Sequence, residues 1–293
     1  MKCDSIVFEV AETVIAVRFD WAIKSPDVPP VLQPFLSDSE PEFTVFMRNS
    51  GLPSISLLEE DKLFETEGHW AMYSTGEKRV LVTAPQGDEQ APSHMAVIHE
   101  GFGSAEIFSR TPNYWQTEGI LSEDPIGFPL SQLLIVWLMA QGRGLMVHAC
   151  GIKDGDKGYL FAGNSGHGKT TMAKLWRRHG MVLNDDRIIL RPKDGRYRMY
   201  GTPWHGLYTR VSSESVPLEK IFFLGRSETN SAVPVTKTAA GAKLLSRSFP
   251  PLWDKDGMLS TLDLVHGLTT KVPCFDFGFI HDRSVVEFAR CVK

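Results

Sequence analysis

Residues Tyr159 to Thr170 read YLFAGNSGHGKT and contain the strongest structural signal in the second half of the chain. Its last eight residues, Gly163 to Thr170, fit the pattern G-x-x-x-x-G-K-[ST] completely. An apolar run, Tyr159–Ala162, precedes the glycines, and a helix-forming run begins at Lys169. This order predicts a strand, a glycine-rich loop and a helix, which is the setting in which such a loop binds phosphate.

The residues of the loop suit a nucleotide polyphosphate. The glycines let the backbone curl so that its N–H groups turn inward, at the positive end of the following helix. Lys169 is expected to reach the β- and γ-phosphates and Thr170 to ligate Mg²⁺. The alternative is a glycine turn that only caps the helix, but a cap needs neither Lys169 nor Thr170. The residues expected to contact ATP are Gly163, Asn164, Ser165, Gly166, His167, Gly168, Lys169, Thr170 and Thr171.

Two adjacent carboxylates, Asp185 and Asp186, follow a short apolar run at Met181–Leu183. At the carboxyl end of a strand, one carboxylate can hold Mg²⁺, directly or through water, while the other accepts the proton of an attacking hydroxyl. The pair also fits a turn rich in Asp and Asn. Its position shortly after the glycine loop favours the functional interpretation.

Three further polar side chains are candidates. His148 ends an apolar run, where a lone histidine is usually a satisfied core residue. His205 lies among turn formers at Gly201–Gly206, and loops held in this way often carry binding groups. Arg247 is chemically suited to donate to a transferring phosphoryl group, although a surface salt bridge is the commoner role. His205 and Arg247 are therefore candidate contacts to substrate or phosphate.

The charge of the 293-residue chain is unevenly distributed. Residues 1–124 hold 8 Lys and Arg against 21 Asp and Glu, a net charge of −13, whereas the remainder holds 23 against 14, a net charge of +9. Short β-prone runs separated by turn signals predict an acidic, largely antiparallel β-rich domain over 1–124. Beyond it strands and helices alternate, which predicts an α/β domain with a mixed sheet over 125–293 and an α+β protein overall.

Several classes of protein are disfavoured. The four cysteines form no C-x-x-C pair and are too sparse for a disulfide scaffold. Charged residues interrupt the N-terminal segment, and no apolar run is long enough to span a bilayer. These features predict a cytoplasmic protein with no membrane partner. No cluster of basic and aromatic residues stands out, so no nucleic-acid partner is expected.

Three segments together resemble the HPr kinase/phosphorylase family: Val147–Ala149, Ala162–Thr170 and Leu183–Arg187. Phosphoenolpyruvate carboxykinase shares the loop and the acidic pair, and the two families belong to one structural superfamily, although the full carboxykinase is much longer. The similarity covers roughly Val147–Arg191. It implies a mixed-sheet P-loop domain of the HPr-kinase and PEP-carboxykinase type. The β-rich domain that precedes it has no clear match.

The resemblance also implies roles for single residues. His148 matches the family's active-site histidine, Lys169 its phosphate lysine and Thr170 its metal-binding serine. Asp186 matches the catalytic carboxylate that deprotonates the acceptor serine, with Asp185 beside it near the metal. The family's later metal-binding glutamate and its phosphorolysis segment have no clear counterpart here. The resemblance thus implies an ATP-dependent kinase for a serine-type hydroxyl on a protein or peptide, and it suggests a homo-oligomer.

Two other functions fit the same residues. A nucleotide-sensing or scaffold module needs the loop but no base, so the intact Asp185-Asp186 pair disfavours it. A P-loop ATPase coupled to motion usually carries its acid after a long apolar strand, and Met181–Leu183 is short. The identity of the acceptor is not encoded in any motif of the chain.

Overall fold

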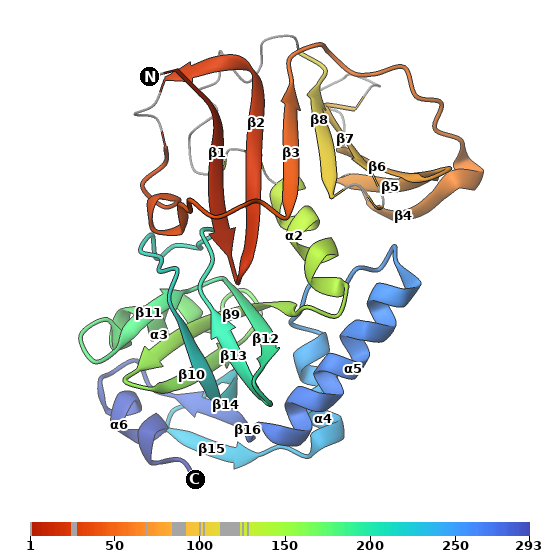
Figure 1. The fold of residues 1–293 in the computed structure, drawn as a ribbon. Helices are drawn as coiled ribbons and strands as arrows, with labels where there is room; N and C mark the ends of the chain where they lie inside the picture. Colours follow the sequence, from red (N-terminus) through yellow and green to blue (C-terminus); the bar gives the residue numbers. More distant parts are fainter. Residues whose placement is uncertain are drawn as a thin grey trace. The chain divides into compact units, whose positions relative to one another are not determined.

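The structure, a computed structural model, describes residues 2–24, 28–67, 69–83, 92–99, 101, 103–111, 124, 126–127 and 129–293. The chain forms two compact units, shown in Figure 1: Met1–Ile135 with Leu252–Asp254, and Val136–Pro251 with Lys255–Lys293. We expected one boundary, after residue 124. The division in the structure comes after Ile135, and the chain returns briefly to the first unit at Leu252.

The first unit contains an eight-stranded sheet in the order β1-β2-β3-β8-β7-β6-β5-β4. Its neighbouring strands are antiparallel except for the parallel pairs β2–β3 and β3–β8. The expectation of largely antiparallel pairing is therefore confirmed. The strands are β1 (Lys2–Val10), β2 (Thr13–Lys24), β3 (Phe43–Arg48), β4 (Lys62–Thr66), β5 (Trp70–Thr75), β6 (Lys78–Thr83), β7 (His94–His99) and β8 (Ser104–Ser109), with short 3₁₀ turns η1 (Gln33–Phe35) and η2 (Glu59–Asp61).

The second unit contains a mixed sheet in which two long strands are shared. The first half of β9 (Leu145–Asp154) pairs with β12 and its second half with β10 and β11. In the same way β14 (Ser215–Arg226) pairs with β13, β10 and β16. The pairing therefore closes into a ring, β9-β12-β13-β14-β10. The other strands are β10 (Lys157–Ala162), β11 (Met181–Asn184), β12 (Arg187–Lys193), β13 (Arg196–Tyr200), β15 (Ser231–Pro234) and β16 (Cys274–Phe279).

Three strands of this sheet, β10, β14 and β16, run parallel to one another. Their carboxyl ends therefore meet at one edge, the edge at which ligands bind in α/β sheets. Buried phenylalanines, one from each strand, hold them together: the ring centroids of Phe161 and Phe222 lie 5.1 Å apart, and those of Phe222 and Phe277 lie 4.6 Å apart. This aromatic core makes the edge a rigid support for the loops that leave it.

The sequence predicts helices over 129–141, 169–178, 239–246, 255–266 and 285–291. The structure has a helix at each place, with α5 continuing beyond its predicted end: α2 (Leu130–Ala140), α3 (Lys169–Trp176), α4 (Lys237–Leu245), α5 (Lys255–Lys271) and α6 (Ser284–Cys291). Sequence analysis missed β4, the first part of β14 and β15. The exposed, proline-ended β15 has only four residues, too few to show a periodicity. None of the described helices has the length and hydropathy needed to cross a membrane.

Candidate functional site

The Gly163–Gly168 loop joins the carboxyl end of β10 to the first residue of α3. Two of its glycines have left-handed backbone angles, with φ of +79° at Gly166 and +95° at Gly168. A Cβ on Gly168 would stand 2.7 Å from the ring of Phe279, at the end of β16. Glycine is therefore required at residue 168 both by the backbone angle and by the close approach of the neighbouring strand.

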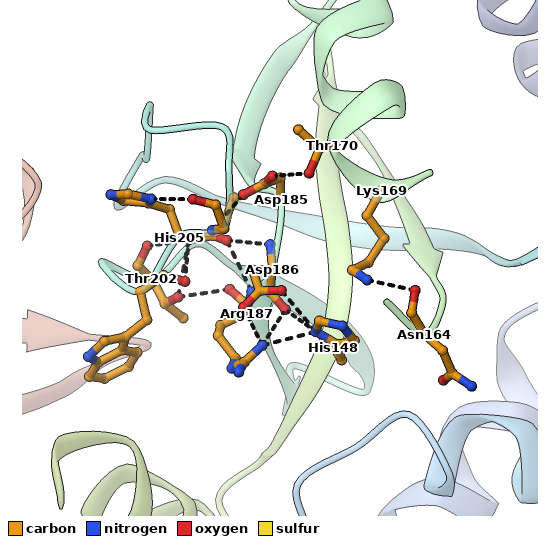
Figure 2. A network of polar contacts seen from close by, with 12 residues as sticks. His148, Asn164, Lys169, Thr170, Asp185, Asp186, Arg187, Thr202 and His205 are labelled. Carbon is orange, nitrogen blue, oxygen red and sulfur yellow. Dashed lines mark hydrogen bonds and ion pairs between the residues drawn. The ribbon is translucent and has the colours of Figure 1, made fainter. Parts of the chain in front are cut away.

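Lys169 is buried, and its side chain turns back over the loop (Figure 2). Its Nζ donates to the carbonyl oxygen of Gly163 at 2.8 Å and to that of Asn164 at 3.0 Å. Burial lowers the pKa of this ammonium group, because the charged form is poorly solvated there. These two bonds use two of its three N–H donors and leave one for a ligand.

Asp185 is almost completely buried and joins three segments. It accepts hydrogen bonds from the Thr170 hydroxyl at 2.7 Å, from the Gly206 amide at 2.8 Å and from the Tyr208 amide at 3.1 Å. A carboxylate that accepts three hydrogen bonds is held in one orientation. Asp185 therefore ties the start of α3 to the loop that follows β13.

Asp186 is bound by two cationic or polar side chains. His148 Nδ1 lies 3.0 Å from Asp186 Oδ1, and the Arg187 guanidinium pairs with Oδ2. Burial alone would raise the pKa of Asp186, but the hydrogen bond from His148 and the charge of Arg187 outweigh it, so the pKa lies below its usual value. Arg187 in turn stacks on Phe249, with its guanidinium carbon 4.4 Å from the ring centroid.

Asn184 fixes the turn that carries both carboxylates. Its Oδ1 accepts from the amide of Asp186 at 2.7 Å and from that of Arg187 at 3.0 Å. Its Nδ2 donates to the carbonyl oxygens of Thr202 at 2.8 Å and Trp204 at 3.1 Å. The acidic pair thus lies in an Asx turn, and this turn also orients the pair toward α3 and His148.

A cavity of about 800 Å³ opens beside the loop at the carboxyl ends of the parallel strands. Of the residues expected to contact the nucleotide, all except Gly163 and Asn164 line it. Asp186 and His148 line it as well. Its remaining walls are Gly206, Leu207, Gly225, Arg226, Ser227, Phe279, Ile280 and His281, which sequence analysis did not select.

Apart from Gly163 and Asn164, three candidates from the sequence lie outside this lining: the buried Asp185, His205 and Arg247. His205 Nδ1 contacts the carbonyl oxygen of Gly206 at 2.8 Å. The Arg247 guanidinium donates to the carbonyl oxygen of Lys243 at 2.8 Å and lies over the Phe223 ring. The backbone of Arg247 does reach the site, because its carbonyl oxygen accepts from the His148 amide at 2.7 Å.

Asn184 and Arg187 were not selected from the sequence. An Asn immediately before an acidic pair is a turn signal and was available in the sequence. The role of Arg187 depends on the register of β12 on β9, which places it opposite His148 although the two are far apart in sequence. No local pattern carries that information.

Comparison with known proteins gives limited matches. Residues 128–263 match the model of a family described as SynChlorMet cassette protein ScmC. No curated protein matches the chain. Among solved structures, the chain is similar to the Hpr(Ser) kinase/phosphatase from Coxiella burnetii, with 11% identity and a TM-score of 0.29 over 50% of this chain and 90% of that one. This is a distant similarity, so membership of the HPr kinase/phosphorylase family stays a prediction.

Proposed function

We propose that this protein is an ATP-dependent phosphotransferase that moves the γ-phosphoryl group of ATP to a serine-type hydroxyl on a protein or peptide. One observation carries the proposal: the glycine loop with Lys169 and Thr170 lines the same cavity as the paired Asp186 and His148. The volume of about 800 Å³ falls in the range of small-molecule sites. The serine type of the acceptor rests on the motif resemblance.

The loop and the start of α3 supply the phosphate donors. Backbone N–H groups at a helix N-terminus attract anions, and Gly166 and Gly168 let the backbone turn there. Lys169 adds a buried ammonium group with one unused donor. A buried charge is costly without a counter-ion. A phosphate oxygen would supply that counter-ion by accepting a hydrogen bond from the third N–H of Lys169.

Thr170 and Asp185 are the residues that would hold Mg²⁺. Mg²⁺ is usually bound by one or two carboxylates together with substrate phosphates rather than by a cage of protein ligands. Within the described part of the chain, no group of three or more His, Cys, Asp or Glu side chains could hold a metal by itself. A hydroxyl 2.7 Å from a buried carboxylate, at the start of α3, fits this mode of binding. When bound, Mg²⁺ neutralises charge on the phosphates.

The acceptor hydroxyl would lie beside Asp186 and His148. These side chains are each about one fifth exposed, so a substrate can touch them, yet both are fixed by neighbours. Fixed polar groups favour phosphoryl transfer because little reorganisation is needed when charge moves. A nucleotide sensor has no use for such a pair next to the phosphate donors.

Nucleotide binding is the first test. A fluorescent ATP analogue with Mg²⁺ is titrated into the wild type, Lys169→Ala and Lys174→Ala. Lys174 is exposed on the same helix and is the matched control. We expect binding by the wild type and the control and a loss of at least ten-fold in Lys169→Ala. Equal binding by all three proteins would overturn the site assignment.

Transfer is the second test. The protein is incubated with γ-labelled ATP and heat-treated lysate of the source organism, and labelled species are identified by mass spectrometry. Label on a serine of a protein or peptide supports the proposal. Release of free phosphate alone would instead indicate an ATPase, and binding without either product would indicate a nucleotide sensor.

A further inference from the structure

The environment of the His148 ring differs sharply at its two nitrogens. Nδ1 is crowded: it lies 3.0 Å from Asp186 Oδ1, 3.2 Å from the Asp186 carbonyl oxygen and 2.9 Å from the Arg187 guanidinium. Nε2 has no hydrogen-bond partner among the residues that the structure describes. It is also absent from the set of side-chain polar atoms that are both unpartnered and inaccessible to solvent, so it is accessible. Since His148 lines the cavity, its second nitrogen is open to a substrate.

The contacts at Nδ1 decide which nitrogen carries the proton. Two oxygens of Asp186 converge on Nδ1, so a proton there gives them a donor. A lone pair there would face both oxygens with no proton between. Arg187 Nη1, 2.9 Å from Nδ1, can only donate, but both of its hydrogens have acceptors in Asp186, one in the carboxylate and one in the carbonyl oxygen at 3.4 Å. The guanidinium therefore does not require a lone pair at Nδ1. The neutral ring is therefore protonated at Nδ1 and carries its lone pair at Nε2, toward the cavity.

Asp186 is occupied by this arrangement. One carboxylate oxygen receives His148 and the other receives Arg187, whose guanidinium is partly buried and stacked on Phe249. A carboxylate that holds an imidazole by Nδ1–H sets the tautomer and the direction of the ring, as in hydrolytic triads. In this geometry Asp186 orients the imidazole, and Nε2 of His148 is the basic atom that has no hydrogen-bond partner.

We infer that His148, through Nε2, accepts the proton of the acceptor hydroxyl, and that Asp186 is a positioning residue that orients and charge-compensates the imidazole. This inference rests on the proposed function and changes one assignment within it, because the motif resemblance places the proton on Asp186. It makes His148 a catalytic residue of the transfer step.

The hydroxyl oxygen forms a bond to the γ-phosphorus as its proton passes to His148 Nε2. The bond between the γ-phosphorus and the oxygen that bridges to the β-phosphorus breaks, and its electron pair leaves with ADP. The products are a phosphate ester, ADP and an imidazolium ion paired with Asp186. Loss of that proton to water regenerates the site.

The test compares His148→Ala, His148→Asn and Asp186→Asn in the labelled-lysate assay. His148→Asn keeps a donor toward Asp186 but has no basic nitrogen. We expect both His148 variants to bind the fluorescent ATP analogue within a few-fold of the wild type and to lose transfer by about 10²–10⁴-fold. Added imidazole should restore transfer at least ten-fold in His148→Ala. It should not restore Asp186→Asn, and it should not affect the control His266→Ala, whose side chain is exposed on α5.

A readout independent of activity is the ¹⁵N spectrum of the His148 ring in the wild type, which should show Nδ1 protonated and Nε2 unprotonated at neutral pH. The inference is overturned if the ring is protonated only at Nε2. It is also overturned if His148→Asn transfers as the wild type does, or if imidazole has no effect on His148→Ala. These outcomes leave the proposed function standing as long as the wild type transfers label. A wild type that transfers none overturns the proposed function, and the inference with it.

Discussion

The Thr170 hydroxyl donates a 2.7 Å hydrogen bond to Asp185, and the same carboxylate accepts the backbone amides of Gly206 and Tyr208. One buried side chain therefore connects the start of α3 to the loop whose Gly206 and Leu207 also line the cavity. A ligand that draws the Thr170 hydroxyl away would remove one of the three hydrogen bonds that orient Asp185, the residue that also accepts the Gly206 and Tyr208 amides. In the proposed function, the nucleotide side and the acceptor side of the site would share this residue.

Asp185→Ala should release that segment. A buried donor left without its acceptor costs about 1–3 kcal/mol, and two amides lose their acceptor here. We expect faster hydrogen exchange at the amides of Gly206 and Tyr208, together with loss of the Mg²⁺ dependence of ATP binding. Asp263→Ala, on the exposed face of α5, serves as the control. Unchanged exchange at both amides would show that Asp185 does not hold the loop.

Gly168→Ala should disrupt the loop for two separable reasons. The backbone angle φ of +95° disfavours any side chain, and the new Cβ would stand 2.7 Å from the Phe279 ring. The control is Gly155→Ala, which has a φ of +60° but no atom within 4 Å of the point where the new Cβ would stand, so it isolates the backbone cost of roughly 1–2 kcal/mol.

We expect thermal denaturation to show a larger loss of stability for Gly168→Ala than for Gly155→Ala, and ATP-analogue titration to show weakened binding only for Gly168→Ala. Combining Gly168→Ala with Phe279→Leu should recover part of the difference, because the smaller side chain relieves the contact. Equal losses in the two single variants would mean that the approach of Phe279 is unimportant.

Asn184→Ala should destabilise the turn beneath the acidic pair. The side chain is fully buried and bonds four backbone groups, and each buried group left unsatisfied costs about 1–3 kcal/mol. Urea denaturation should show a loss of at least that size. Asn184→Asp keeps the acceptor for the Asp186 and Arg187 amides but places a buried carboxylate oxygen against the carbonyl oxygens of Thr202 and Trp204, so it should be at least as destabilising as Asn184→Ala at pH 7.

The parts of the site that sequence analysis predicted are those encoded within a few neighbouring residues. The loop ending in Lys169 and Thr170 is one local pattern, and the structure places it between β10 and α3 as expected. The acidic pair is another. The Arg187–His148 contact depends on strand register, and the Gly206 and Tyr208 amides reach Asp185 from a loop with no distinguishing motif. These contacts are set by long-range pairing, which a single sequence does not reveal.

The same reasoning explains the fold. The β-prone run Phe43–Met47 predicts a strand, and the structure has β3 there, with side chains alternately buried and partly exposed. The run gave no information about partners, and so the parallel pairs β2–β3 and β3–β8 were not foreseen. The closed ring through β9 and β14 was missed for a related reason: each strand changes partners along its length, and no residue marks the change.

The stability of the first unit should depend on pH through Glu106 on β8, which binds Arg48 and His99. Arg48 donates to its Oε1 at 2.8 and 2.6 Å, and His99 Nε2 lies 3.3 Å from Oε2. Burial would raise the pKa of Glu106, but these two partners outweigh burial and lower the pKa below its ordinary value of 4.5. A lowered pKa contributes stability that is present above the ordinary value and is lost as the pH falls through the lowered one.

Glu106→Gln should therefore be less stable than the wild type at pH 7, by up to about 1 kcal/mol for a partly exposed pair. The difference in the free energy of unfolding, measured in urea from pH 7 to pH 3, should narrow below pH 4.5. Glu67→Gln, an exposed change in the same unit, should show no such narrowing, and a gap for Glu106→Gln that stays constant with pH would contradict the assignment.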